Sequence, residues 1–294
     1  GPYRQSERFA LYREYCRTLL ERGAAYKAYE TPEELAAMRE EQKANKQPPR
    51  YNGAHRDLTD TERAAFEAEG RPYVVRLRVP DGETGWHDLV RGRVVWQNRE
   101  IDDFVIQKSD GSPTYNFACA VDDTLMRITH VIRGEDGLSN TPRQLLLYRA
   151  LDFDAPQFAH LPFLLGPDRS KLSKRHGAVN LLQFRDEGIL PQAMFNYLAL
   201  LGWNPGEGET QEVFSREELI ERFSLEHVNK AGAIFDREKL QWINTQYLKA
   251  LPIVQFVELA QPHLMLPLDA NDEYSQRALA MARERLRCPR PNVS

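Results

Sequence analysis

The chain has 294 residues and a formal net charge of −4, and 41% of its residues are hydrophobic while 28% are charged. This composition excludes a disordered chain, and the length favours two or more domains. No apolar run approaches the ~20 residues that span a bilayer. The N-terminus is polar and three cysteines lie far apart, at Cys16, Cys119 and Cys288. We therefore expect no membrane contact, no secretory signal, no disulfide framework and a cytoplasmic location.

The N-terminal part of the chain is predicted to be mostly helical. Residues 6–20 place apolar side chains at helical spacing. Thr31, followed by a proline and two glutamates, is typical of a helix start, and the helix that follows is expected to end before residues 48–49, both prolines. Another short helix is predicted over residues 59–69, which end next to a glycine.

The middle of the chain alternates between strand and helix. Strands are predicted at residues 73–79, 93–96 and 104–107, the last one leading into a tight turn. Two buried strands are predicted at residues 127–132 and 158–165, with a helix over residues 141–151 between them. A strand, a helix and a second strand, with functional loops at the strand ends, suit an open parallel α/β sheet.

The C-terminal part is predicted to be helical. A buried helix is expected over residues 191–201, and Ser215 with Glu218 forms the pattern of a capping box. Asp236 is expected to cap another helix, and two further helical patterns follow Leu251.

The segment between Asp168 and Gly177 has two lysines, Lys171 and Lys174, interleaved with serines and flanked by arginines. Fixed positive charges and hydroxyl donors in one loop suit a polyanion such as a transferring phosphate group. Taken alone, the segment is explained equally well as a solvated basic turn.

The loop resembles the KMSKS signature of class I aminoacyl-tRNA synthetases, in a KLSKR form followed by His-Gly. Ordered segments upstream of it, and two downstream, are similar to glutamyl-tRNA synthetases, and they lie at residues 113–117, 121–123, 129–136, 140–144, 232–236 and 239–244. The resemblance runs from Gly1 to about Leu248. It implies an α/β fold with a Rossmann-like parallel nucleotide-binding sheet, an α+β insertion and α-helical domains after it.

The same resemblance implies a domain organisation. We expect a partial nucleotide-binding catalytic domain in residues 1–21 and 102–185, and an insertion that binds the tRNA acceptor end in residues 22–101. A helical stem-contact domain is expected in residues 186–250, and the start of a helical anticodon-binding domain in residues 251–294.

The activity implied by the resemblance is ATP-dependent activation of L-glutamate and its transfer to the 3′ end of tRNA(Glu). Lys171 and Lys174 are expected to hold the triphosphate as the catalytic residues, and Lys174 to stabilise the transition state most directly. Ser173 is expected to contact the nucleotide, and Asp136 the hydroxyl groups of its ribose. Mg²⁺ is the expected metal cofactor of ATP, and the protein is expected to be a monomer.

Glutamate recognition is expected at Arg133 and Tyr115. An arginine suits a carboxylate because it can bind both oxygens at once. A structural pairing of Arg133 with Asp122 or Asp123, and a core role for Tyr115, remain open. The two aspartates are interpreted as neighbours on a strand that point to opposite faces, so one is expected to be structural and the other to face the site. A structural role for both remains open.

No protein-bound metal is predicted. Many relatives carry a zinc site in the insertion, but the corresponding positions here are Ala28, Glu30, His55 and Asp57, without a thiolate. No catalytic dyad is indicated by the scattered histidines, which include His55, His87, His130, His160 and His176.

RNA contact needs local basic side chains, because the net charge is mildly acidic. A candidate patch contains Arg39, Lys43, Lys46, Arg50, His55 and Arg56. Spacings of three to four residues would place the first three of these on one helix face. A solvated charged helix that also carries glutamates explains the same pattern equally well.

The HIGH motif of the family is expected before Gly1, so we expect the 294 residues to be an incomplete enzyme on their own. Rival interpretations are a shorter paralogue that modifies a tRNA base, a glutaminyl enzyme, and a fragment that binds tRNA without charging it. The segment from Lys239 to Tyr247 argues against the paralogue, and the KLSKRHG loop favours the glutamate type. Whether tRNA(Gln) is also charged stays open.

Overall fold

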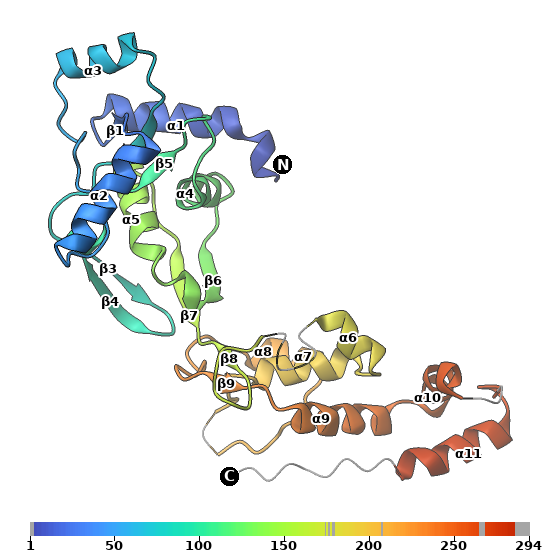
Figure 1. Ribbon diagram of the computed structural model, residues 1–294. Helices are drawn as coiled ribbons and strands as arrows, with labels where there is room; N and C mark the ends of the chain where they lie inside the picture. Colours follow the sequence, from blue (N-terminus) through green and yellow to red (C-terminus); the bar gives the residue numbers. More distant parts are fainter. Residues whose placement is uncertain are drawn as a thin grey trace. The chain divides into compact units, whose positions relative to one another are not determined.

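The computed structural model describes residues 3–173, 175, 177, 180–206, 208–264 and 268–285. The chain divides into two compact units, Gly1–His160 and Leu161–Ser294, and each is described by itself (Figure 1). No helix of the described residues is long and apolar enough to cross a membrane.

The first unit contains an antiparallel sheet with the strand order β1-β2-β5. Its strands are β1 (Ala25–Ala28), β2 (Val74–Leu77) and β5 (Val105–Gln107). Helix α1 (Phe9–Glu21) precedes the sheet, and α2 (Pro32–Ala44) and α3 (Asp60–Ala68) lie between β1 and β2 along the chain. Both α2 and α3 begin with a complete capping box, because Thr31 and Thr59 each exchange hydrogen bonds with a glutamate three residues on.

A second sheet of this unit has the order β4-β3-β7-β6. It is made of β3 (Glu83–Asp88), β4 (Gly92–Gln97), β6 (His130–Gly134) and β7 (Gln157–Leu161). Strands β3 and β4 form an antiparallel hairpin, whereas β3 pairs with β7 in parallel where Asp88 faces Phe158. The sheet is therefore mixed rather than parallel throughout, and a hairpin from the predicted insertion shares a sheet with β6 and β7.

Helices α4 (Tyr115–Leu125) and α5 (Thr141–Leu151) pack against each other and against α1. Their apolar faces join the strands in one core, in which Leu19, Val75, Ile106, Phe117 and Leu147 are buried. Because only residues 135–140 separate β6 from α5, the first turn of α5 lies close to the end of that strand.

The second unit is mostly helical and has one short parallel pair, β8 (Leu164–Leu165) with β9 (Ala233–Ile234). Its helices are α6 (Leu181–Asp186), α7 (Pro191–Leu200), α8 (Arg216–Arg222), α9 (Arg237–Ala250), α10 (Ile253–Ala260) and α11 (Glu273–Glu284). Helices α7 and α9 share a core that includes Tyr197 and Ile243, and α10 and α11 share a smaller one. Short 3₁₀ turns in the chain lie at Gln5–Glu7, Asn98–Glu100, Glu135–Gly137 and Gln261–His263.

Three sequence-based expectations about the elements are wrong. The helix predicted over residues 6–20 begins only at Phe9, after a 3₁₀ turn. The strand predicted over residues 127–132 begins at His130, because Arg127 takes a left-handed conformation after the end of α4. The strand predicted over residues 158–165 is two strands, since Pro162 lies between β7 and β8 and cannot donate a hydrogen bond to a neighbouring strand.

Candidate active site

Arg133 lies near the end of β6, and its guanidinium is held by three neutral acceptors. Its Nε donates to Nε2 of His160 at 3.1 Å. Its Nη2 donates to Oγ1 of Thr141 at 2.8 Å and to Oε1 of Gln144 at 3.0 Å. Thr141 and Gln144 are three residues apart in the first turns of α5, so they face the same side of the helix. These three hydrogen bonds join Arg133 to neutral side chains and not to Asp122 or Asp123, the alternative partners that the sequence left open.

Asp88 and His160 form a fully buried pair behind Arg133, and both side chains are 0% exposed. Nδ1 of His160 lies 2.5 Å from Oδ2 of Asp88. Oδ1 of Asp88 accepts from the backbone N–H groups of Val90, Arg91 and His160. Burial opposes the ionisation of Asp88, but the hydrogen bonds from the His160 ring and these N–H groups together keep its pKa below the ordinary value.

Gly137 lies against the side chain of Arg133. A Cβ atom added at Gly137 would be 2.4 Å from Nε of Arg133 and 2.6 Å from its Cδ, distances that Cβ contacts do not tolerate. The close approach therefore requires glycine here, and it fixes the path of the arginine side chain above the 3₁₀ turn Glu135–Gly137.

Tyr115 is the first residue of α4 and is 59% exposed, so it is not a core tyrosine. The Cys119 thiol, followed by burial, raises the pKa of Tyr115, and the hydrogen bond and charge of Arg133 act in the opposite direction. The effect of Arg133 on this pKa indicates that its guanidinium lies near the Tyr115 hydroxyl. The structure thus brings together the two residues that the sequence assigns to glutamate.

Asp122 and Asp123 lie on α4 and not on a strand, so the expectation that they point to opposite faces of a sheet is wrong. Asp122 is buried and accepts from Tyr12 and Arg8, at 2.8 Å in each case. Asp123 accepts from Tyr148 at 3.2 Å. Each aspartate therefore has a structural partner, on α1 for Asp122 and on α5 for Asp123. The sequence predicted neither pairing.

Asp136 lies in the exposed 3₁₀ turn that follows β6. A Cβ atom added at Gly134 would be 2.6 Å from its Oδ1, so this glycine leaves room for the carboxylate. The neighbouring Glu135 pairs with Arg91, which also donates from Nε to the backbone carbonyl of His160 at 3.3 Å. The turn that carries Asp136 is thereby tied to the loop after β3.

The loop with Lys171 is built by short-range contacts within the second unit. The backbone N–H of Gly166 donates to the carbonyl of Ser170 at 2.8 Å, and Leu165 pairs with Lys171 in an antiparallel bridge. Oγ of Ser170 donates to Asp168 at 2.7 Å. Nζ of Lys171 lies 4.3 Å from the ring centre of Phe163, so the ammonium group is over an aromatic face.

Ser173 is half-buried at the end of this bridge. Lys174 and His176 lie outside the described residues, so the structure says nothing of the residue expected to stabilise the transition state most directly. Arg175 donates to Oγ of Ser170 at 2.5 Å and lies 3.7 Å from Asp168.

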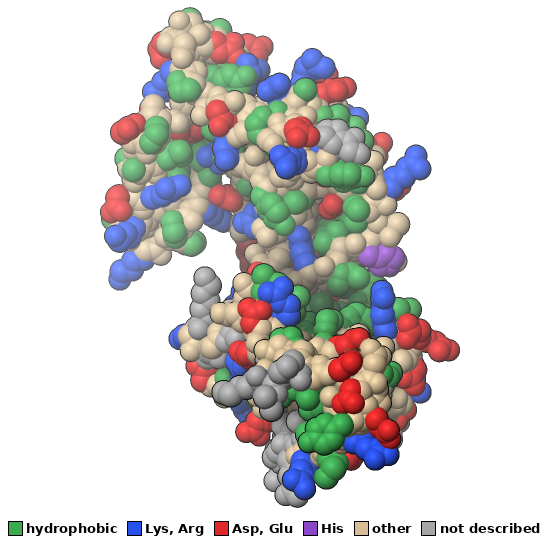
Figure 2. Space-filling model, turned by 90° about the vertical axis from the view of Figure 1, so that its right-hand side faces the viewer, with side chains coloured by type: hydrophobic (Ala, Val, Ile, Leu, Met, Phe, Trp, Pro, Cys, Tyr) green, Lys and Arg blue, Asp and Glu red, His purple; other side chains and the backbone are tan. Residues whose placement is uncertain are grey.

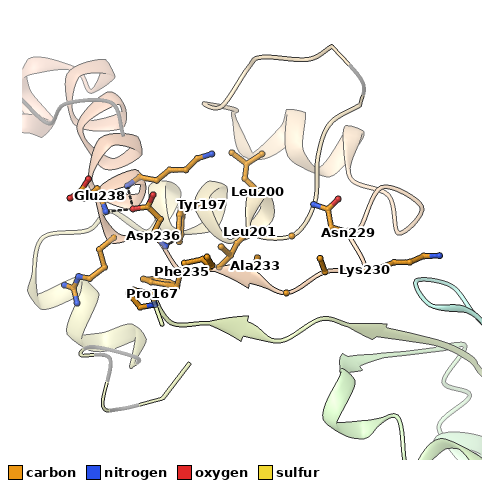
Figure 3. Close-up of a pocket in the computed structure, with 16 residues that line it drawn as sticks. Pro167, Tyr197, Leu200, Leu201, Asn229, Lys230, Ala233, Phe235, Asp236 and Glu238 are labelled. Atoms are coloured by element: carbon orange, nitrogen blue, oxygen red, sulfur yellow. Dashed lines mark hydrogen bonds between the residues drawn. The ribbon is translucent and has the colours of Figure 1, made fainter. Parts of the chain in front are cut away.

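A cavity of about 890 Å³ lies beside the base of the loop, entirely within the second unit. Figure 3 shows Pro167 from the loop at one end of it and Lys230 at the other, with Asp236 capping the backbone N–H groups of residues 238 and 239. Two of its basic side chains already face carboxylates, because Lys239 pairs with Glu212 and Arg237 with Glu187. Its charge is therefore largely balanced by the protein itself.

At the positions that correspond to the zinc site of relatives, Glu30, His55 and Asp57 contact other protein side chains. Oε1 of Glu30 lies 3.2 Å from Nδ1 of His55, and Glu30 also accepts from Tyr51. Asp57 instead pairs with Arg78 at 2.7 Å. Within the part of the chain that the structure describes, no group of three or more metal-ligating side chains occurs. The absence of zinc stays a prediction.

The candidate basic patch is not continuous. Helix α2 contains Arg39 and Lys43 but ends before Lys46, which has a left-handed conformation, so the three do not share one helix face. His55 contacts Glu30, and Arg56 donates to Asp103 at 2.7 Å. On the face drawn in Figure 2, basic and acidic side chains lie side by side in each unit, as expected from the small net charge.

Sequence reasoning missed the residues behind Arg133. In the sequence, His160 is one of several scattered histidines without a catalytic pattern. No signal there gives a role to Asp88, Gly137, Thr141 or Gln144 individually. The spacing of Thr141 and Gln144 on a helix that follows β6 was an available signal. The pairing of Asp88 with His160 joins residues 72 apart in the sequence, and no local pattern reveals it.

Comparison with known proteins shows the family of the chain. Residues 1–242 match the family described as tRNA synthetases class I (E and Q), catalytic domain. The chain is 49% identical to the glutamate–tRNA ligase of Desulforudis audaxviator, with 97% of this chain and 58% of the relative aligned. It is 51% identical to that of Aquifex aeolicus, with 96% and 60% aligned.

Solved structures show the same similarity. A glutamate tRNA ligase from Elizabethkingia meningosepticum, determined in complex with its amino acid, superimposes with a TM-score of 0.87 at 36% identity. The alignment covers 97% of this chain and 62% of that one. A glutamate-tRNA synthetase from Elizabethkingia anophelis gives a TM-score of 0.84 at 37% identity, over 97% and 63%. The chain spans about three fifths of the length of the curated relatives it matches.

Proposed function

Because this chain belongs to the catalytic-domain family of class I tRNA synthetases for glutamate and glutamine, we propose that it acts in glutamate–tRNA ligation. In this reaction ATP activates L-glutamate as glutamyl-adenylate, and the glutamyl group is then transferred to the 3′ end of tRNA(Glu). The observation that carries the proposal is Arg133, which is oriented by neutral acceptors and lies beside the Tyr115 hydroxyl.

Arg133 favours glutamate over glutamine as the substrate. Its contacts to His160, Thr141 and Gln144 fix the guanidinium without neutralising its charge. A fixed cation attracts the side-chain carboxylate of glutamate, whereas the neutral amide of glutamine would leave the charge unpaired. The Tyr115 hydroxyl can donate to the same carboxylate. This difference supports the glutamate enzyme over the glutaminyl enzyme.

For ATP, we propose that Lys171 and Lys174 hold the triphosphate, with Ser173 contacting the nucleotide and Asp136 accepting from the ribose hydroxyl groups. Lys171 is exposed, and its backbone pairs with Leu165 at the start of the loop that also contains Ser173. Positive charge at the phosphates is the main requirement of phosphoryl chemistry, because the transition state differs from the bound substrate mostly in its charge distribution. Lys174 is assigned on its position in the KLSKR motif alone.

Mg²⁺ would enter this site together with ATP. Mg²⁺ keeps several water ligands and is usually bound through one or two carboxylates and the substrate phosphates. This suits the described residues, which contain no group of three or more metal-ligating side chains. Bound in this way, Mg²⁺ neutralises phosphate charge. A cytoplasmic monomer remains our expectation.

The test is aminoacylation by the complete protein with tRNA(Glu), ATP and Mg²⁺. Glutamate attached to the 3′-terminal ribose, detected by mass spectrometry of the tRNA end, is the expected product. Attachment of glutamine, or modification of an internal base, would replace the proposal by one of its rivals. Binding of tRNA with no product in the presence of ATP and glutamate would support a binding protein without ligase activity.

A further inference from the structure

We propose that Asp88 and His160 are positioning residues for glutamate recognition: the buried Asp88 holds His160 in one neutral tautomer, and His160 in turn fixes Arg133 through an acceptor that carries no charge. The inference rests on the proposed function only in taking glutamate as the ligand of Arg133. The contacts that carry it all lie within the first unit.

Three groups face the His160 ring: Asp88 at Nδ1, and Arg133 and Oγ1 of Thr141 at Nε2. The Thr141 hydroxyl, 3.1 Å from Nε2, can donate or accept, so the tautomer follows from Asp88 and Arg133. Asp88 is held as a carboxylate, which can only accept, so Nδ1 of His160 at 2.5 Å must carry a proton. Nε2 faces the Nε–H of Arg133 at 3.1 Å, and this group can only donate. Nε2 must therefore be without a proton, and the ring is neutral in this arrangement.

The surroundings keep this pair dry and in place. Asp88 and His160 are 0% exposed, and the ring of Phe158 lies parallel to the His160 ring, 6.2 Å away between centres. The Arg133 guanidinium lies 5.7 Å from the ring centre of Phe158. Phe158 and His160 are two residues apart on β7 and so face the same side of the sheet.

The chemical advantage concerns the charge of Arg133. A carboxylate placed directly against the guanidinium would orient it equally well, but it would also neutralise it and compete with the substrate. Here the Asp88 carboxylate contacts His160 instead of Arg133, and the neutral His160 imidazole contacts the guanidinium. Arg133 is then fixed in direction and keeps its positive charge for a substrate carboxylate, so less ordering remains to be done when the ligand binds.

Asp88→Asn is the most direct test, because the backbone dictates how the new amide must point. Three backbone N–H groups converge on Oδ1 of Asp88, so the amide oxygen must stay there and the NH₂ group must face His160. Nδ1 of His160 would then have to accept, and its proton would move to Nε2. That proton would point toward the Nε–H of Arg133 or toward Oγ1 of Thr141, which lies 3.1 Å from Nε2. In either case the Nε–H of Arg133 loses its acceptor on His160.

The first measurement is the nitrogen-15 spectrum of the imidazoles in the full chain, with the His160 signals assigned by the loss of signal in His160→Gln. A protonated Nδ1 and an unprotonated Nε2 are expected in the wild type, with the reverse in Asp88→Asn. A doubly protonated ring, or a protonated Nε2 in the wild type, would overturn the proposal. This measurement does not depend on any enzymatic activity.

The second measurement is the aminoacylation kinetics of the complete protein. In Asp88→Asn the KM for glutamate should rise about tenfold or more, the scale of a lost hydrogen bond to a charged group, while the KM for ATP changes little. His160→Gln, whose side-chain oxygen can accept from Arg133, should keep most of the glutamate affinity. Gly137→Ala should raise the KM for glutamate by displacing Arg133 directly.

Asp103→Asn is the matched control. Asp103 is also a buried carboxylate of the first unit, but it accepts from Tyr26 and Arg56 and is not among the hydrogen-bond partners of Arg133. It should lower Tm without a specific rise in the KM for glutamate. Equal KM changes in the two variants would show a merely structural role for Asp88. If the wild type does not attach glutamate to tRNA, the proposed function fails, but the nitrogen-15 spectrum still decides the tautomer.

Discussion

Arg133 is oriented by side chains from two other elements of the first unit and backed by a third, whereas the described contacts around Lys171 lie mainly within its own loop in the second unit. The contacts behind Arg133 come from β3, β7 and the start of α5. The contacts around Lys171 join residues only a few positions apart, between Phe163 and Arg175. The β8–β9 pair links this loop to a distant segment, and Leu172 packs against the core that α7 and α9 share.

This difference fits the two proposed ligands. A side-chain carboxylate has a fixed size and shape, so a donor set arranged in advance can select it and reject an amide. A triphosphate is a large polyanion, and neutralising its charge matters more than matching its shape. Four substitutions can break or sharpen the distinction.

Arg133→Ala should have the largest effect. Removing one partner of a buried charged contact costs about 2–5 kcal/mol, so kcat/KM for glutamate should fall on the order of 10²- to 10³-fold. The KM for ATP should stay near its original value. Arg149→Ala is the control, since Arg149 is an exposed arginine at the end of the neighbouring helix α5. Equal losses in the two variants would remove Arg133 from glutamate recognition.

Lys171→Ala should have the next largest effect, on ATP rather than on glutamate. Loss of one group that stabilises developing charge lowers kcat on the order of 10²-fold. ATP–pyrophosphate exchange measures this step, and equilibrium binding of glutamate should be unchanged. Lys108→Ala removes the same charge from an exposed turn of the first unit and should leave exchange intact. If the Lys171 variant exchanges normally, the loop is a solvated basic turn.

Gly232→Ala tests the link between the loop and β9. An added Cβ would lie 2.9 Å from Cδ1 of Leu165 and 3.0 Å from the carbonyl of Phe163. Overpacking of this kind costs about 1–3 kcal/mol, so Tm should fall by several degrees. A smaller loss of exchange activity should accompany it. Adding Leu165→Ala should recover part of the loss, and an unchanged Tm in the single variant would show that the strands tolerate the methyl group.

The smallest effect concerns pH. Hydrogen bonds keep the pKa of Asp88 below its ordinary value, so its contribution to stability is present above the unfolded carboxyl pKa of about 3.9 and is lost as pH falls through the lower, folded value. The wild type should be more stable than Asp88→Asn at neutral pH, and the gap should close in acid. Urea unfolding between pH 3 and 7 measures it. A gap independent of pH would contradict the assignment of Asp88 as an ionised carboxylate.

Local signals predicted much of the fold. Thr31 and Ser215 indicate helix starts in the sequence, and both helices begin with a complete capping box. The helix predicted over residues 141–151 has those bounds. The motifs also pointed to Arg133 and Tyr115, which the structure brings together. These features depend on neighbours in the sequence or on a recognisable motif.

The remaining features depend on distant parts of the chain. The sequence does not reveal helix α4, because Asp122 and Asp123 are interpreted there as neighbours on a strand. The role of Asp88 arises only when β3 pairs with β7, and β3 itself was not predicted. His160 on β7 gains a function from Asp88 on β3 and Arg133 on β6, which face its ring, so the function depends on three different strands.

The central claim is that Arg133 selects glutamate by its charge. The most direct test is the ratio of kcat/KM for glutamate to that for glutamine, measured by tRNA charging with the complete protein and with Arg133→Ala. We predict a strong preference for glutamate that largely disappears in the variant, while Arg149→Ala keeps it. A preference that survives the loss of Arg133, or a wild type that charges glutamine as readily as glutamate, would contradict the account.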